Sequence, residues 1–273
     1  MEVQFCCALE VSDDKAHLHR GCSSLSSFRS LCREKKADSD PIFPDVTARG
    51  RALYEYDEAA WHSSDALQAT NPPKESLGRY VAHKSDTGWT VAFGRLNDRS
   101  DKFVVAYEAT EGANLKEFTV KKIDPPREDA GFYLSAARAI ETALHDFHGE
   151  NRPYNVAVLP APSDQLYVYV LPAQTKAGIY PLGGDVRYVI SPDGGSIVEK
   201  RQLHKSIIEL PPSSDRGAKP VAGVHIHVLS NVPEDTDVFH VLTRQPPQPE
   251  YVGTPNKKFY EISTDGTIRE RKM

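Results

Sequence analysis

Two stretches with helical periodicity, each followed by a series of strand-like stretches, constrain the fold of this 273-residue chain more than any other feature. Helices are predicted over residues 51–68 and 131–148, because apolar residues recur in both at the 3.6-residue period of a helix. After each helix, apolar and polar residues alternate in short runs that turn residues separate, as in antiparallel hairpins. The sequence therefore predicts an α+β fold with two antiparallel β-sheet sets, each preceded by one helix.

Composition and turn residues divide the chain into three parts. Residues 1–48 are rich in Ser and charge, and we expect them to form a disordered N-terminal tail. Residues 49–124 are expected to form an N-terminal α+β lobe, and residues 125–273 a β-rich C-terminal lobe. The linker Asp124-Pro125-Pro126 is short, so a single α+β domain with one continuous sheet is the alternative.

All four cysteines lie in the predicted tail. With two nearby histidines they make a set of residue types that zinc accepts: Cys6, Cys7, His17, His19, Cys22 and Cys32. Adjacent cysteines are not the Cys-x-x-Cys spacing of a zinc knuckle, so we interpret the tail as disordered and keep a structural zinc site as the alternative. Outside the tail the chain has no cysteine, which excludes a catalytic thiol there.

Charge and hydropathy limit the expected partners. The net charge is −5, and the basic residues form no long run, so neither nucleic acid nor a membrane is expected as a partner. No stretch approaches the ~20 apolar residues of a membrane helix, and residues 1–9 lack the features of a signal peptide. We expect a soluble chain, cytoplasmic by default, whose partner is an unknown protein or small molecule.

The segment Val224-His225-Ile226-His227-Val228 carries the strongest chemical signal. Two histidines two positions apart on a strand point to the same side of the sheet. The acidic turn Pro233-Glu234-Asp235-Thr236-Asp237 follows within reach. Zinc, iron and manganese accept two neutral imidazoles and a carboxylate, with a position left for water. The sequence therefore predicts a metal site at His225, His227 and Asp237, with zinc as a candidate ion.

Several groups stay open as further parts of this site. Glu234 and Asp235 are alternative acidic ligands, and His240 lies in residues 238–243, which are predicted to form the next strand. A glutamate could take a proton from a metal-bound water. Three upstream residues offer that group: Glu150, Glu199 and Glu209.

An ordinary amphipathic strand is the alternative interpretation of the same segment. In that arrangement Val224, Ile226 and Val228 face the core, and the two histidines face solvent. The acidic residues would then serve only the geometry of a turn.

The order of these features resembles the JAMM-type (MPN-domain) metalloproteases and their toxin-associated relatives. A helix and strands precede a His-x-His segment, an acidic-ended turn follows, and the later turn Tyr251-Val252-Gly253-Thr254-Pro255 is similar to the toxin-associated branch. The resemblance covers residues 130–273 at most. Val228 and Glu234 stand where the family has Pro and Ser, and the spacing to the aspartate is one residue shorter.

The resemblance implies roles for four residues. His225, His227 and Asp237 would hold zinc, and Glu150, just before the strand that begins at Tyr154, would activate water for peptide or isopeptide hydrolysis.

Two classes of function follow from the sequence. The first, slightly favoured, is a non-enzymatic binding module that uses an exposed aromatic sheet face at Tyr167, Tyr169 and Tyr188. The second is a metal-dependent hydrolase that uses the His-x-His segment and Asp237. The chain has no Gly-x-Ser-x-Gly motif and no phosphate-binding loop that would suggest a third.

Overall fold

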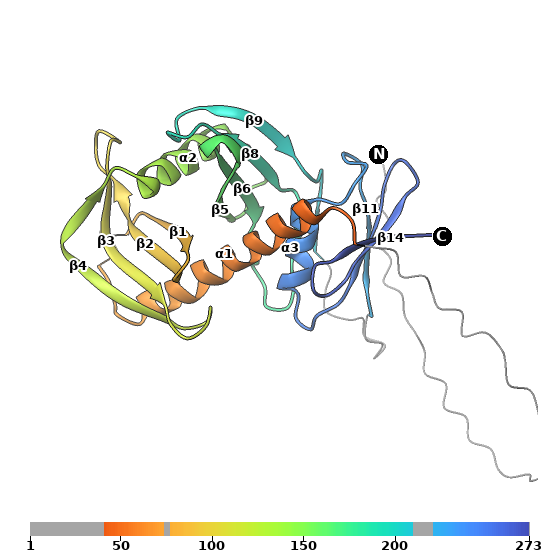
Figure 1. Cartoon of the computed structure of the whole chain (residues 1–273), viewed down its shortest axis with the longest axis horizontal. Helices are drawn as coiled ribbons and strands as arrows, with labels where there is room; N and C mark the ends of the chain where they lie inside the picture. Colours follow the sequence, from red (N-terminus) through yellow and green to blue (C-terminus); the bar gives the residue numbers. More distant parts are fainter. Residues whose placement is uncertain (1–40, 74–76, 210–220, 273) are drawn as a thin grey trace, which may run out of the picture.

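The computed structural model describes residues 41–73, 77–209 and 221–272. These residues form three α-helices, three four-stranded sheets and one two-stranded sheet (Figure 1). The architecture is α+β, as the sequence predicts. Residues 1–40, which hold most of the predicted tail and all of its cysteines, lie outside the described residues.

The first two sheets repeat one order of elements. Helix α1 (Pro44–Gln68) precedes the first sheet, and helix α2 (Phe132–Asp146) precedes the second, which confirms the predicted arrangement. The first sheet has the order β1-β2-β3-β4, with β1 (Arg79–Ser85), β2 (Gly88–Leu96), β3 (Phe103–Glu111) and β4 (Phe118–Asp129). The second has the order β5-β6-β8-β9, with β5 (Tyr154–Pro160), β6 (Leu166–Pro172), β8 (Val186–Ile190) and β9 (Ile197–Gln202).

Two boundaries differ from the prediction. Helix α1 begins at Pro44, so residues 44–48 belong to a helix although they were assigned to the tail. Proline suits this position because the first helical N–H has no partner inside the helix. Strand β4 continues through the Asp124-Pro125-Pro126 segment, where the β3–β4 register shifts, so the predicted lobe boundary falls inside a strand.

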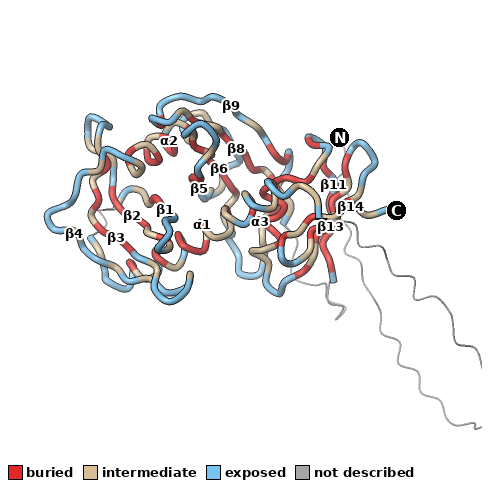
Figure 2. Tube along the Cα trace, viewed as in Figure 1, coloured by how far each residue is buried: buried red, intermediate tan, exposed pale blue. Residues whose placement is uncertain are grey.

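Side chains on the two faces of the strands form two separate hydrophobic cores. Val81 of β1 packs with α2 and strands β5, β6 and β8, whereas its neighbour Ala82 packs with α1. Successive strand residues point to opposite faces, so each helix covers a different face of the strands. Buried segments therefore lie between the two helices, and β9 is largely exposed (Figure 2).

The sequence did not predict the last sheet as a sheet of its own. This sheet contains β11 (Gly223–Ile226), β12 (Glu250–Gly253), β13 (Phe259–Ile262) and β14 (Ile268–Arg271) in that order. Strands β11 and β12 pair in parallel and are joined through helix α3 (Asp235–Thr243), because parallel neighbours need a crossover. Six buried residues make its core: Val238, Val241, Val252, Tyr260, Ile262 and Ile268.

The prediction of a strand over residues 238–243 is wrong. These residues belong to α3, whose first turn is closed by a capping box between Glu234 and Asp237. Val238 and Val241 are both buried, and their spacing of three is that of one helix face. Val238, Phe239 and Val241 are residue types that are common in strands, but the capping box fixes a helix.

Two short strands lie beside the last sheet. Strands β7 (Leu182–Gly183) and β10 (Ile207–Ile208) pair with each other in the segments that flank β8 and β9. In the part of the chain that the structure describes, no helix combines the length and the apolar character needed to cross a membrane.

Candidate metal centre

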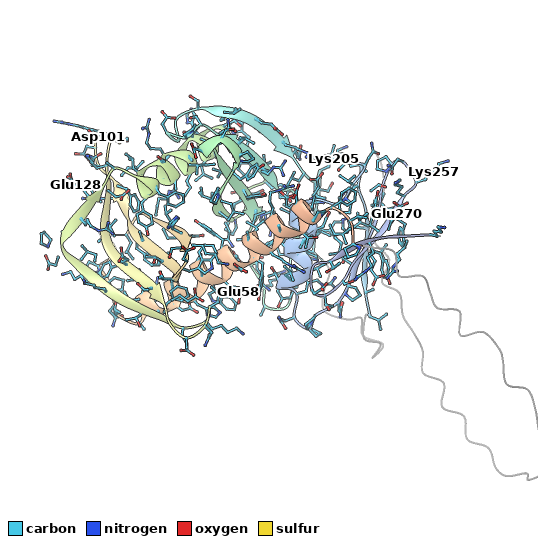
Figure 3. The ribbon with its side chains drawn as sticks, viewed as in Figure 1. Glu58, Asp101, Glu128, Lys205, Lys257 and Glu270 are labelled. Atoms are coloured by element: carbon cyan, nitrogen blue, oxygen red, sulfur yellow. The ribbon has the colours of Figure 1, made fainter. Side chains whose placement is uncertain are left out.

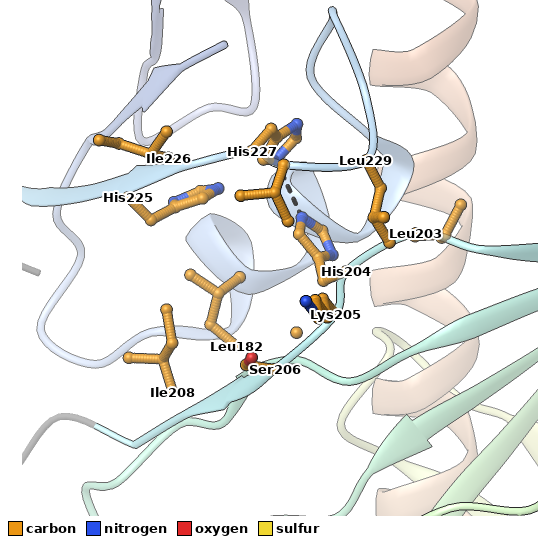
Figure 4. A pocket seen from close by; sticks show the side chains of 12 residues that line it. Leu182, Leu203, His204, Lys205, Ser206, Ile208, His225, Ile226, His227 and Leu229 are labelled. Atoms are coloured by element: carbon orange, nitrogen blue, oxygen red, sulfur yellow. Dashed lines mark hydrogen bonds between the residues drawn. The ribbon is translucent and has the colours of Figure 1, made fainter. Parts of the chain in front are cut away.

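Four buried side chains converge between the second and the last sheet. His204, His225, His227 and Asp237 each offer one ligand atom, and these atoms all lie within 4.8 Å of one another. The structure thus brings together the three residues predicted as metal ligands and adds His204. The histidines come from two places in the chain, the segment after β9 and strand β11 with the residue after it (Figure 4).

Strand β11 buries its histidines and exposes its aliphatic residues. His225 and His227 are each 2% exposed, whereas Ile226 and Val228 are each 49% exposed. This is the reverse of the ordinary amphipathic strand that was the alternative interpretation. Burying two imidazoles instead of two aliphatic side chains costs free energy unless the rings have partners.

The capping box of α3 orients Asp237. Its Oδ2 accepts a hydrogen bond of 2.7 Å from the backbone N–H of Glu234. Its Oδ1 lies 3.0 Å from Nε2 of His204 and 3.1 Å from Nε2 of His225, while Oδ2 lies 3.1 Å from Nε2 of His227. One carboxylate therefore closes a helix terminus and faces three imidazoles.

Each imidazole is held from behind by an acceptor. Nδ1 of His204 lies 2.8 Å from Asp185, and Nδ1 of His225 lies 2.8 Å from Glu250. Nδ1 of His227 lies 3.0 Å from the carbonyl oxygen of Val232, which can only accept. These contacts place a proton on Nδ1 of each ring, so in the neutral form each Nε2 carries a lone pair.

The cluster consequently lacks a donor at its centre. In the neutral rings, three Nε2 lone pairs and a carboxylate face one point, and Nε2 of His204 and Nε2 of His227 are only 2.9 Å apart. Two N–H groups cannot face each other at that distance. Nε2 of His225 is buried and forms no hydrogen bond within the described residues. The arrangement requires protons or a cation between the ligand atoms.

The spacing suits a tetrahedral ion. Ligand atoms at about 2.0–2.1 Å from zinc would stand about 3.3 Å from one another. The contacts between Asp237 and the ring nitrogens of His204, His225 and His227 measure 3.0–3.3 Å. All four ligand atoms lie within 4.8 Å of one another, so zinc binding would require the rings to adjust toward the spacing of a tetrahedral site.

The pKa values of the cluster also show that positive charge is favoured between these groups. Burial disfavours the imidazolium of His204, but Asp185 and Asp237 outweigh burial and raise the pKa of His204 well above its usual range. In the same way, burial opposes the charge on His225, but Asp237 and Glu250 raise its pKa to about 9. Burial would raise the pKa of Asp237, yet the three histidines hold it well below its usual range.

Two glycines allow the outer contacts to form. A Cβ on Gly183 would collide with the carbonyl oxygen of Ser206, so this glycine, at a positive φ of 84°, lets the turn before Asp185 lie against the His204 segment. A Cβ on Gly223 would collide with the Glu250 carboxylate and with Arg244, which donates a hydrogen bond of 2.9 Å to Glu250. The segment Gly183-Gly184-Asp185 thus carries a residue that supports the cluster.

The two acids that were alternatives to Asp237 face arginines instead. Asp235 accepts hydrogen bonds from Arg49 at 3.0 Å and from Arg187 at 2.7 Å. Glu234 pairs with Arg201. Neither belongs to the cluster of ligand atoms.

His240 lies on α3 rather than on a strand. It is buried, and desolvation lowers its pKa to about 4. A neutral imidazole is therefore favoured there, outside the group of four ligands.

The structure does not bring the predicted upstream glutamates into the cluster. Glu150 is exposed and its backbone N–H donates to the Tyr154 hydroxyl at 2.9 Å. Glu209 pairs with Arg152 at 2.7 Å, and Glu199 lies on exposed β9.

The aromatic face expected for partner binding is not exposed. Tyr169 and Tyr188 are both 0% exposed. Tyr167 is half-buried, with the guanidinium groups of Arg49 and Arg187 over its ring at 5.9 and 5.2 Å. These tyrosines therefore serve packing, because the same strands are covered on both faces.

A pocket reaches the cluster from the side of strands β7 and β10. Three of the four ligand residues line it, and aliphatic side chains form most of the remaining wall (Figure 4). The pocket holds about 10 Å³ of space, which is about the room that one water needs.

His204 was missed because it belongs to no short-range pattern. It stands 21 residues before His225 and just after a strand, and only the packing of two sheets brings it close. The number of histidines could have narrowed the search for a further ligand. After residue 149 the chain has four histidines, of which His225 and His227 were already predicted ligands, so His204 and His240 were the two remaining candidates.

Comparison of the chain with protein-family models, curated proteins and solved structures finds no significant match to any of them.

Proposed function

We propose that this chain is a binding module built around a transition-metal ion, with zinc the best-fitting ion, held by His204, His225, His227 and Asp237. The supporting observation is the convergence of three ring nitrogens and one carboxylate, in which the outer nitrogen of each ring already has an acceptor and the carboxylate already accepts a backbone hydrogen bond. Imidazole nitrogens and a carboxylate oxygen are the ligands that zinc takes, and the outer contacts orient them as in known metal sites.

The ion would also hold the last sheet against the rest of the protein. Its ligands belong to the segment after β9, to strand β11 with the residue after it, and to α3. The core of the last sheet is small: six buried apolar residues, with Ile42, Phe43, Val46 and Leu242 packed against them. Small cores commonly gain stability from a metal or a disulfide. Four protein ligands are typical of structural zinc, which favours the binding module over an enzyme.

A hydrolase of the JAMM type is the second candidate. The space for one water beside three imidazoles supports it, since a zinc-bound water is the nucleophile of such enzymes. Within the described residues, however, no aspartate or glutamate lines the pocket, and Glu150 lies outside it. A metal-loaded protein that cleaves peptide or isopeptide bonds, and loses this activity in Glu150→Gln, would reverse the preference.

Metal content tests the proposal. The purified full chain is depleted with a chelator, reloaded with zinc, and its bound metal is measured by mass spectrometry. We expect about one zinc per chain to be lost in His225→Ala and in His227→Ala, and to be retained in His148→Ala, a control at an exposed histidine of the chain. Equal zinc content in all four proteins would contradict the proposal, because the zinc would then be bound elsewhere.

A further inference from the structure

The pocket meets the cluster on the side away from Asp237. His204, His225 and His227 line the pocket, whereas Asp237 does not. Seen from the pocket, the carboxylate therefore stands behind the three rings. If an ion were bound by all four residues, the pocket would reach it at the face between the three ring nitrogens. Zinc can expand from four to five ligands, so this face is where a fifth ligand would bind.

The dimensions of the pocket limit what can reach that face. The pocket leaves about 10 Å³ of space in all, so a single donor atom fits. Beyond that space the pocket is open to solvent. A ligand can thus place one small group on the ion, and its chain would lie on the exposed surface around the pocket.

The wall of the pocket combines one positive charge with an aliphatic surface. Lys205 and Ser206 are its polar residues apart from the histidines, and no acid lines it within the described residues. Lys205 lies between β9 and β10 (Figures 3 and 4). It forms no ion pair with any described residue. Six aliphatic residues also line the pocket: Leu182, Leu203, Ile208, Ile226, Val228 and Leu229.

These features select an anion with an aliphatic chain. A carboxylate oxygen is a small donor that zinc accepts. A phosphate would bring more charge and more oxygens than Lys205 and Ser206 could satisfy. Val228 and Leu229 are 49% and 50% exposed, and a short branched chain would cover apolar surface there.

Building on the proposed metal site, we propose that the pocket binds a small monocarboxylate with a branched aliphatic chain. One carboxylate oxygen takes the fifth position on the ion, the other faces Lys205, and the chain packs against Val228 and Leu229. The ligand is either a free short-chain acid or the C-terminal aliphatic residue of a peptide, which present the same chemistry.

Cobalt substitution tests this proposal. The full chain is loaded with Co²⁺, and its visible spectrum, which responds to a change from four to five ligands, is titrated with acetate, 3-methylbutanoate and N-acetyl-leucine. The spectrum of Asp237→Ala is subtracted to remove Co²⁺ held elsewhere. We expect 3-methylbutanoate to bind at least about tenfold more tightly than acetate, because each buried methylene contributes about fourfold. Tighter binding of N-acetyl-leucine than of 3-methylbutanoate identifies a peptide terminus, and weaker binding identifies a free acid.

Three variants separate the parts of the pocket. Lys205→Gln should weaken both simple carboxylates about three- to fivefold and leave the spectral response to imidazole unchanged, since only the anions use the charge. Lys116→Gln, an exposed lysine near the end of β3, is the control that should change nothing. Val228→Thr keeps the shape of the side chain and should weaken 3-methylbutanoate more than acetate.

The outcomes distinguish this inference from the metal site itself. If the cluster binds Co²⁺ and neither carboxylate alters the spectrum, four protein ligands close the ion and the pocket proposal is overturned alone. Equal affinities for acetate and 3-methylbutanoate would also overturn it, because the aliphatic wall would take no part. If the cluster binds no Co²⁺, the proposed function fails as well.

Discussion

Asp235 and Asp237 lie two residues apart on the first turn of α3, both buried, and their surroundings are opposite. Asp235 faces donors: Arg49, Arg187 and the Tyr169 hydroxyl at 2.6 Å. Asp237 faces three ring nitrogens that have no proton to give in their neutral form. The Asp235 cluster is complete within the protein, whereas the Asp237 cluster needs either added protons on the rings or a cation. Burial alone therefore does not identify a functional acid. The groups that face the carboxylate identify it.

The largest difference between the two acids is expected when the Asp237 carboxylate is removed from the metal site. Asp237→Ala should abolish the stabilisation that added zinc gives the wild type. For free zinc at a thousand times its dissociation constant, that stabilisation is about 4 kcal/mol. Urea unfolding of metal-depleted protein, with and without zinc, measures the difference. An undiminished zinc effect in the variant would place the ion elsewhere.

The matching change on the other acid should act without any metal. Asp235→Ala leaves two guanidinium groups, one of them on the buried Arg187, without their carboxylate. Loss of one partner of a buried ion pair costs about 3–5 kcal/mol. Metal-free unfolding should show this loss, and the folded variant should still bind zinc. A cost below about 1 kcal/mol would mean that the pair is dispensable.

Acid unfolding sharpens the same contrast. Burial opposes ionisation of Asp235, but Arg49, Arg187 and Tyr169 outweigh it and lower its pKa below the usual 3.8. A lowered pKa contributes stability above the unfolded value and loses it as the pH falls through the folded value. The contribution of Asp235 should therefore be full at neutral pH and decline below about pH 3.8, and Asp235→Asn should remove that part of the acid limb.

An outer contact should have a smaller effect than a ligand. Glu250→Gln keeps the size of the side chain but weakens its hold on His225, so zinc affinity should fall about 10- to 100-fold. Competition with a coloured chelator measures this. Glu261→Gln, which also breaks a glutamate–arginine pair of the last sheet, is the matched control and should leave the affinity unchanged. Equal losses in both variants would point to general damage to the sheet.

The smallest effect is expected where the arginine is exposed. Arg201 pairs with the buried Glu234, but its side chain is 40% exposed and water screens the pair. Arg201→Ala should cost less than about 1 kcal/mol in denaturant unfolding and leave zinc binding intact. A loss as large as that of Asp235→Ala would show that the capping residue also depends on its arginine.

Local patterns explain why part of the site was predictable. His225 and His227 share a side because the strand period is two, and Asp237 follows within one turn. The helix that carries Asp237 was missed although Glu234 and Asp237 have capping-box spacing, because the β-branched and aromatic residues after them favoured a strand. The order of helices and sheets was predictable from periodicity, which is set by neighbours in the chain.

By itself, the sequence determined an α+β chain with a helix before each of two sheets, and a strand whose two imidazoles lie on one side. The tertiary structure decided which side of that strand is buried, that His204 joins it from after β9, and that Asp235 and Asp237 diverge toward arginines and imidazoles. The physical reason is range. Periodicity depends on residues a few positions apart, whereas a metal site depends on distances of a few ångströms that only the packing of remote sheets can set.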